Sequence, residues 1–153
     1  MTGARVATVD VYPLRRIEAA WEALVMRRAA GTRCTGAWET VHGRLEPDER
    51  PEDAARRELR EETGFTAERL YNVSVQPFYL HQWNAVTLAV VFAAVVPADA
   101  PVTLGPEHDT AEWLPLDAAI TRYAWPRSKT ALAEIAWLLR DGDAGAVEDV
   151  LRL

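Results

Sequence analysis

The stretch "GRLEPDERPEDAARRELREETGF", residues 43–65, predicts a loop that leads into a helix. In such a helix Glu58, Glu61 and Glu62 lie within an arc of roughly 100°, so three carboxylates share one face. Like charges at this spacing destabilise a helix by roughly 0.2–0.5 kcal/mol per pair, and stability alone would spread them apart. Bound hard cations such as Mg²⁺, which prefer carboxylate oxygens, are one compensation for this repulsion. A solvated acidic face paired with neighbouring arginines is the alternative.

The ends of this helix carry local signals. Pro51 is tolerated in a first helical turn, because its missing N–H has no helical partner there. Asp48 is a candidate cap, and Arg50 before Pro51 is the alternative start. Gly64 is a natural helix stop.

The rest of the chain predicts strands and two further helices. Strands are expected where apolar residues alternate with polar ones or dominate, at 5–14, 22–29, 38–43, 70–80, 85–96 and 111–116. Pro13 suggests that the first strand ends or lies at an edge. Helices are predicted over 116–123 and 127–142, and 144–153 adds a last turn or frays. This order implies a mixed sheet with helices packed on it.

Length and composition restrict the class of protein. A chain of 153 residues suits one domain with one core. The net charge of −6 argues against a broad electrostatic grip on DNA or RNA. Cys34 is the single cysteine, so no internal disulfide is expected, which fits a reducing cytoplasm. The first residues carry early charges without a long apolar run, so neither a signal peptide nor a membrane span is expected.

Residues 43–65 also follow a longer pattern, G-x5-E-x7-R-E-L-x-E-E-x-G-F. Its fixed positions are Gly43, Glu49, Arg57, Glu58, Leu59, Glu61, Glu62, Gly64 and Phe65. This pattern resembles the Nudix box, and every defining position is met. The flanking segments, a strand with Trp38 before the box and "GPEHDTAEWLPL" after it, are similar to those of the family. The resemblance implies a Nudix fold of the α/β (α+β) type, with a mixed β-sheet between helices, as a single domain over residues 1–153.

The resemblance implies a metal site on the acidic helix face. Its expected ligands are Glu58, Glu61, Glu62 and the backbone carbonyl of His42, with Mg²⁺ as the cofactor and Mn²⁺ as the alternative. The sequence "VHG" stands where many relatives have "PGG", a departure at the backbone ligand. The other box positions have structural roles. Gly43 allows close backbone approach, while Glu49 and Arg57 are expected to pair and hold loop to helix.

The resemblance further implies hydrolysis of a nucleoside diphosphate linked to another moiety. Metal ions neutralise phosphate oxygens and lower the pKa of a bound water, and a carboxylate takes its proton. The candidates for this base are Glu62, Glu58 and Glu107, and the sequence leaves the choice open. Glu107 comes from a loop whose acidic residue completes the metal site in similar families. His108 and His81 are weaker candidates, because lone histidines are more often structural or exposed.

Aromatic and basic residues are candidates for substrate contacts. The first aromatic candidates are Trp38 and Tyr79, followed by Trp83 and Trp125, because aromatic side chains stack on nucleotide bases. The first basic candidate for a substrate contact is Arg28, and the others are Arg33, Arg127 and Lys129. For each of these residues, core packing or surface solubility is the alternative interpretation.

The wider pattern is similar to Nudix enzymes that cleave dATP or dihydroneopterin triphosphate to a monophosphate and pyrophosphate. An ADP-ribose or nucleotide-sugar pyrophosphatase is the second enzymatic alternative. A non-catalytic nucleotide sensor is the alternative of another class, but such domains commonly lose a box glutamate and this chain keeps them all. The expected partner is a nucleotide-type small molecule, with no nucleic acid and no membrane. A homodimer is expected because the family is often dimeric.

Overall fold

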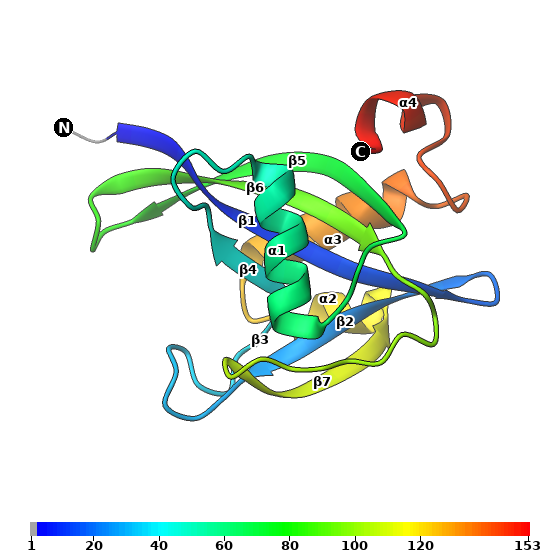
Figure 1. The fold of residues 1–153 in the computed structure, drawn as a ribbon, viewed down its shortest axis with the longest axis horizontal. Coiled ribbons are helices and arrows are strands. Elements are labelled where there is room, and N and C mark those ends of the chain that lie inside the picture. Colours follow the sequence, from blue (N-terminus) through cyan, green and yellow to red (C-terminus); the bar gives the residue numbers. More distant parts are fainter. Residues whose placement is uncertain (1–2) are drawn as a thin grey trace.

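The computed structural model describes residues 3–153 as a mixed sheet with helices on both faces (Figure 1). The strands are β1 (Gly3–Ile17), β2 (Ala20–Arg28), β3 (Trp38–Glu39), β4 (Val41–Arg44), β5 (Arg69–Leu80), β6 (Ala85–Val95) and β7 (His108–Pro115). They are ordered β3-β2-β1-β6-β5, with β4 paired to β1 and β7 to β2. The β1–β6 pair is parallel, and the other pairs are antiparallel. The predicted fold class is confirmed.

Helices cover the two faces of the sheet. They are α1 (Pro51–Thr63), α2 (Leu116–Arg122), α3 (Pro126–Leu138) and α4 (Glu148–Leu151), with a 3₁₀ turn over Gly145–Val147. Figure 1 shows α1 on one face, with α2 and α3 on the other. Ala54, Ala55 and Leu59 of α1 are buried in a core with Val9 and Val11 of β1. The opposite side of β1 packs against α3 in a second core. Within residues 3–153, no helix combines the length and apolarity that crossing a membrane requires.

The prediction that Pro13 ends β1 or places it at an edge is wrong. β1 runs to Ile17 and lies between neighbours on both sides. On one side β1 pairs with β4 through Val11, and with β2 only from Leu14 onward. Pro13 falls in this gap, where a missing N–H costs no ladder bond to either antiparallel neighbour.

Other boundaries also differ from the sequence prediction. The expected strand 38–43 is two short strands separated at Thr40, whose hydroxyl donates to the Val11 carbonyl oxygen at 2.6 Å. Asp48 does not cap α1: the residue before the helix is Arg50, and it makes no side-chain cap hydrogen bond. The last long helix ends at Leu138, four residues before the expected stop at Gly142.

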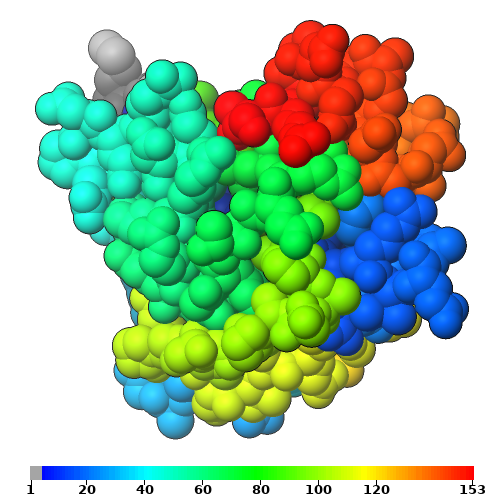
Figure 2. Space-filling model, turned by 45° about the vertical axis from the view of Figure 1, so that its right-hand side comes forward, coloured from blue at the N-terminus to red at the C-terminus, as the bar shows by residue number. Residues whose placement is uncertain are grey.

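The loop between β6 and β7 docks on the C-terminal end of α1. Gly64 ends the helix in the left-handed conformation, with φ of 77°. Thr103 and Gly105 then donate backbone hydrogen bonds to the carbonyls of Thr63 and Glu62, at 2.9 and 3.3 Å. A side chain at position 105 would press on the Glu61 carbonyl, since a Cβ there would lie 3.0 Å from its oxygen. Figure 2 shows this loop, in yellow-green, running alongside α1. The contact brings the start of β7 beside the acidic face of α1.

Candidate active site

Glu58 lies directly over the backbone of β4. A Cβ built on Gly43 would fall 2.0 Å from Glu58 Cδ and 2.2 Å from its Oε1. Only glycine therefore leaves room for this carboxylate, which is the close approach expected for Gly43. Arg57 Nη1 donates to Glu58 Oε1 at 2.7 Å and fixes the group from the other side.

Arg57 joins the loop, the strand and the helix. Its Nε and Nη2 donate to the two carboxylate oxygens of Glu49, both at 2.8 Å, and Nη2 also reaches the Arg44 carbonyl at 3.0 Å. This is the pair expected from the sequence, in bidentate geometry. The hydrogen bonds from Arg57 lower the pKa of Glu49 to about 2. Arg57 therefore has an orienting role: it holds the loop before α1 against the helix and takes no part in the reaction.

The three helix carboxylates occupy different environments. Glu62 is buried, with 7% of its side chain exposed, whereas Glu61 is 58% exposed. Glu61 pairs with Arg57 at 3.3 Å, so part of the expected repulsion is offset by arginine. Glu58 lies between these extremes, with 13% exposed. The structure thus places Glu58 and Glu62 inward and Glu61 at the rim.

The ionisation of Glu62 is strongly perturbed. Neither of its carboxylate oxygens has a hydrogen-bond partner among residues 3–153. Burial, followed by the charges of Glu107, Glu58 and Glu39, raises the pKa of Glu62 to about 10. An ionised carboxylate at this position therefore needs a positive partner.

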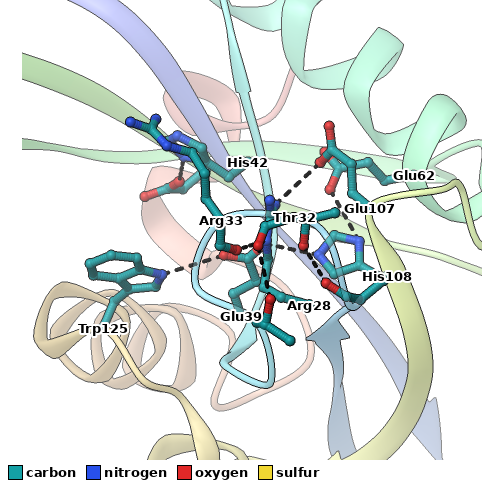
Figure 3. Close-up of polar contacts among 12 residues, drawn as sticks. Arg28, Thr32, Arg33, Glu39, His42, Glu62, Glu107, His108 and Trp125 are labelled. Atoms are coloured by element: carbon teal, nitrogen blue, oxygen red, sulfur yellow. Dashed lines mark hydrogen bonds and ion pairs between the residues drawn. The ribbon is translucent and has the colours of Figure 1, made fainter.

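Glu107 and His108 join Glu62 from the docked loop. One oxygen of each glutamate and one His108 ring nitrogen lie within 4.8 Å of one another. Glu107 is half-exposed, and its Oε2 is 3.5 Å from Arg28 Nη1. Figure 3 shows both residues beside the end of α1. The structure thus brings the loop carboxylate expected from the sequence to the helix face.

Glu39 is a buried site residue that the sequence analysis missed. Its Oε1 accepts hydrogen bonds from His108 Nε2 at 2.9 Å and Arg28 Nη1 at 3.2 Å, and Trp125 Nε1 reaches Oε2 at 3.4 Å (Figure 3). Burial alone would raise the pKa of Glu39, but the hydrogen bond from His108 and the charge of Arg28 outweigh it and lower the pKa. Only its place beside Trp38 in a short strand could have drawn attention to Glu39.

A cavity of about 620 Å³ opens beside this cluster. The sequence candidates that line it are Arg28, Arg33, His42, Gly43, Glu58, His81, Trp83, Glu107, Trp125 and Arg127. Trp38 and Tyr79 do not line it. Trp38 packs with the core on the α3 face, and the Tyr79 ring is exposed while Phe78 and Leu80 face the cavity.

A second buried carboxylate anchors the cavity wall. Asp10 accepts hydrogen bonds from His42 Nδ1 at 2.5 Å and Arg127 Nε at 3.0 Å. Burial opposes the charge of Asp10, yet these two partners hold its pKa below the ordinary value near 3.8. The Arg127 guanidinium lies over the rings of Phe78 and Trp125, at 5.0 and 5.1 Å from their centroids. The His42 side chain is thus committed to Asp10, and only its backbone carbonyl is left as the expected ligand.

The residues present fit a divalent cation. Glu62 offers two buried oxygens that accept no hydrogen bond from the described residues 3–153, and Gly43 keeps open the space that the Glu58 carboxylate occupies. Carboxylate oxygens are the donors that Mg²⁺ and Mn²⁺ prefer. A cation held there would also compensate the charge that burial disfavours on Glu62.

Comparison with known proteins places the chain in a family. The family model of the NUDIX domain matches residues 4–135. The chain is 42% identical over 94 residues to the octanoyltransferase of Myxococcus xanthus, covering 57% of this chain and 25% of that protein. It is 36% identical over 75 residues to the CTP pyrophosphohydrolase of Escherichia coli (strain K12), covering 44% of this chain and 56% of that protein. The matched region thus spans a quarter of the octanoyltransferase and about half of the CTP pyrophosphohydrolase.

Solved structures share the fold. A binary complex of the Ap4A hydrolase of C. elegans has a TM-score of 0.75 at 19% identity, covering 92% of this chain and 99% of that one. The NUDIX domain of NrtR from Shewanella oneidensis, complexed with ADP ribose, has a TM-score of 0.73 at 16% identity, covering 91% and 89%. At these identities the likeness concerns the fold alone. The family match and the complete box together carry the assignment: the chain belongs to the NUDIX domain family.

Proposed function

We propose that this protein is a metal-dependent pyrophosphohydrolase that cleaves a nucleoside, deoxynucleoside or pterin triphosphate to a monophosphate and pyrophosphate. The observation that carries the proposal is an acidic cluster beside an open cavity: Glu58 and Glu107 line the cavity, and Glu62 lies against Glu107. Aromatic rings and arginines line the rest of that cavity. Such a site combines an acidic end for a cation with surfaces suited to phosphates and a base.

The residues divide the chemistry between them. A divalent cation, when bound, neutralises phosphate oxygens and lowers the pKa of a coordinated water. Glu58, Glu61, Glu62 and the His42 carbonyl are the proposed ligands, and Glu58, Glu62 and Glu107 are the candidates to accept the proton of the attacking water. Arg28 and Arg33 line the cavity, which supports a role for both in contacting phosphate oxygens. Arg57 keeps Glu58 in position through its hydrogen bond.

One of the two sequence relatives supports a nucleotide substrate. The CTP pyrophosphohydrolase of E. coli is a triphosphate enzyme by its name, and the wider sequence pattern is similar to the dATP and dihydroneopterin triphosphate type. We include both types in the proposed substrate class. ADP-ribose and nucleotide sugars form the second candidate class, and a panel of substrates separates the two.

A nucleotide panel with Mg²⁺ and with Mn²⁺ tests the proposal. A triphosphate substrate is expected to give monophosphate and pyrophosphate in equal amounts, and EDTA is expected to stop the reaction. Initial release of orthophosphate and diphosphate would contradict the proposed bond cleavage. Turnover of ADP-ribose far above any triphosphate would favour the second class, and binding without turnover would indicate a sensor.

Glu107→Gln is expected to lower kcat much more than it changes stability. Glu107 is half-exposed and makes one long contact to Arg28, so its removal should shift the free energy of unfolding by no more than about 0.5 kcal/mol. Its carboxylate lies in the acidic cluster, so turnover should fall at least tenfold. Steady-state kinetics and a melting curve of the same preparation measure both effects. Unchanged kinetics across pH would show that Glu107 is only a surface charge.

We also propose that residues 1–153 act as one domain in the cytoplasm and pair as a homodimer. The match of the family model to residues 4–135 supports the single domain. Sedimentation of the purified chain measures the oligomeric state.

A further inference from the structure

His108 lies at the junction between the docked loop and β7. Its side chain is fully buried, with 0% exposed. Figure 3 shows the imidazole ring between Glu39 on one side and the Glu62–Glu107 pair on the other. The two ring nitrogens therefore face different groups, and each can be assigned a role.

The contact with Glu39 fixes the tautomer of the ring. Nε2 of His108 is 2.9 Å from Glu39 Oε1, the same oxygen that Arg28 approaches at 3.2 Å. Trp125 approaches the other oxygen of Glu39. A carboxylate surrounded by donors acts only as an acceptor, so Nε2 must carry the proton. In the neutral ring this leaves Nδ1 with a lone pair.

Nδ1 of His108 has no hydrogen-bond partner within residues 3–153, although it is buried. Its nearest carboxylate oxygen is Glu62 Oε1 at 3.7 Å, too long for a hydrogen bond. Two ligands that each lie about 2.1 Å from one octahedral ion are about 3.0 Å apart when adjacent and about 4.2 Å apart when opposite, so 3.7 Å falls within the range that ligands of a shared cation span. Both atoms are unpaired and buried, and a cation between them would satisfy both.

We propose that His108 Nδ1 is a nitrogen ligand of the divalent cation and that Glu39 is the positioning residue that orients it. Metal-bound histidines commonly donate their other N–H to a carboxylate, which fixes the ring and raises its basicity. The Glu39–His108 contact has that arrangement. The inference rests on the proposed cation site, but it adds a ligand from outside the box and a residue behind it.

This ligand changes the expected order of metal preference. A site made only of oxygen donors suits both Mg²⁺ and Mn²⁺, but the harder Mg²⁺ accepts an imidazole nitrogen less well than a transition metal such as Mn²⁺ does. The protein should therefore bind Mn²⁺ more tightly than Mg²⁺. His108→Gln should reduce the ratio of the Mn²⁺ affinity to the Mg²⁺ affinity. If His108 were instead a protonated bridge between Glu39 and Glu62, its replacement would leave the ratio unchanged.

Pulsed electron paramagnetic resonance of the Mn²⁺-loaded protein tests the ligand without turnover. Protein grown with ¹⁵N-labelled histidine and otherwise unlabelled is expected to show a directly coupled ¹⁵N nucleus. This experiment uses the protein without a substitution, so its result does not depend on whether a variant folds. Absence of a coupled ¹⁵N in Mn²⁺-loaded protein would overturn the proposal.

Variants of the labelled protein identify the histidine. His108→Gln is expected to lose the coupling, whereas His81→Gln, in the exposed hairpin, is the matched control that should keep it. Coupling that persists in a folded His108→Gln protein would overturn the assignment. Glu39→Gln is expected to keep the coupling and to weaken Mn²⁺ binding about tenfold, because the carboxylate supports the ring. Unchanged Mn²⁺ affinity in Glu39→Gln would remove the positioning role.

The two proposals fail in different ways. Nitrogen coupling in a protein that hydrolyses no triphosphate would reject the proposed function and support the His108 ligand. Triphosphate hydrolysis by a Mn²⁺-loaded protein without nitrogen coupling would support the proposed function and reject the His108 ligand.

Discussion

Glu62→Gln is expected to remove most of the turnover and, at the same time, to make the metal-free protein more stable. The carboxylate of Glu62 lies in the proposed cation site, so its loss should lower kcat by about a hundredfold or more. Without a cation the same carboxylate is buried beside other acids and has no hydrogen-bond partner in the described chain. Glutamine keeps nearly the same shape and cannot ionise, so it avoids that penalty.

The stability gain should depend on pH with a defined sign. In the unfolded chain Glu62 ionises near its ordinary pKa of 4.5, whereas the folded, metal-free protein holds the proton up to about pH 10. Between these values the folded state binds more protons, so its stability falls as pH rises, by at most about 1.4 kcal/mol per unit. Glu62→Gln removes this contribution, and its advantage at pH 7 should be of order 1–3 kcal/mol. Below pH 4.5 parent and variant should be equally stable.

Melting curves of both proteins in EDTA and in Mg²⁺, across pH, measure these effects. Each kcal/mol should shift the melting temperature by about 2–4 °C in a chain of this size. Mg²⁺ should stabilise the parent more, because a ligand of the folded state adds RT ln(1 + [L]/Kd) and the intact site has the lower Kd. Glu61→Gln is the matched control in EDTA. Glu61 is exposed and pairs with Arg57, so the stability of the Glu61→Gln protein should differ little from that of the parent. A metal-free Glu62→Gln protein less stable than the parent would contradict the assignment.

The sequence predicted those features that follow from local chemistry and fixed spacing. Hydrophobic alternation located the strands, and Pro51 and Gly64 marked the ends of α1 within a residue. The Glu49–Arg57 contact and the approach of α1 to Gly43 follow from the box, because both are fixed by spacing within 23 residues. Pro13 misled the strand prediction, because which neighbour pairs with which part of β1 depends on the whole sheet.

Features of the site that depend on distant segments were not predictable. Glu39 and His108 are 69 residues apart, and only the pairing of β2 with both β3 and β7 brings them together. Periodicity in β5 does not say which side of the strand meets the cavity, so the sequence suggests Tyr79, whereas Phe78 and Leu80 face the cavity. The three helix glutamates share one face by spacing, but their burial depends on distant segments: Glu62 is buried beside Glu107 and His108, whereas Glu61 is exposed.

Gly43→Ala is expected to reduce turnover by about tenfold to a hundredfold in a protein that still folds. The added Cβ would lie 2.0 Å from Glu58 Cδ, so the Glu58 carboxylate must leave its place. Its bond to Arg57 and its position in the metal site would be lost together. The backbone tolerates the change, because Gly43 lies in β4 and is not among the residues with positive φ. Kinetics should show the loss, with weaker Mg²⁺ binding as its cause.

A double-mutant cycle with Glu58→Ala separates this steric effect from a general disturbance of the strand. With the Glu58 side chain already truncated, the alanine at position 43 meets no obstacle, so the double variant should turn over as slowly as Glu58→Ala alone. In that background alanine should also add about 0.5–1 kcal/mol of stability, the usual gain over glycine within a strand. In the parent background that gain should be cancelled by displacement of Glu58. Additive losses in kcat, or a Gly43→Ala protein with normal Mg²⁺ affinity, would show that Gly43 does not act by making room for Glu58.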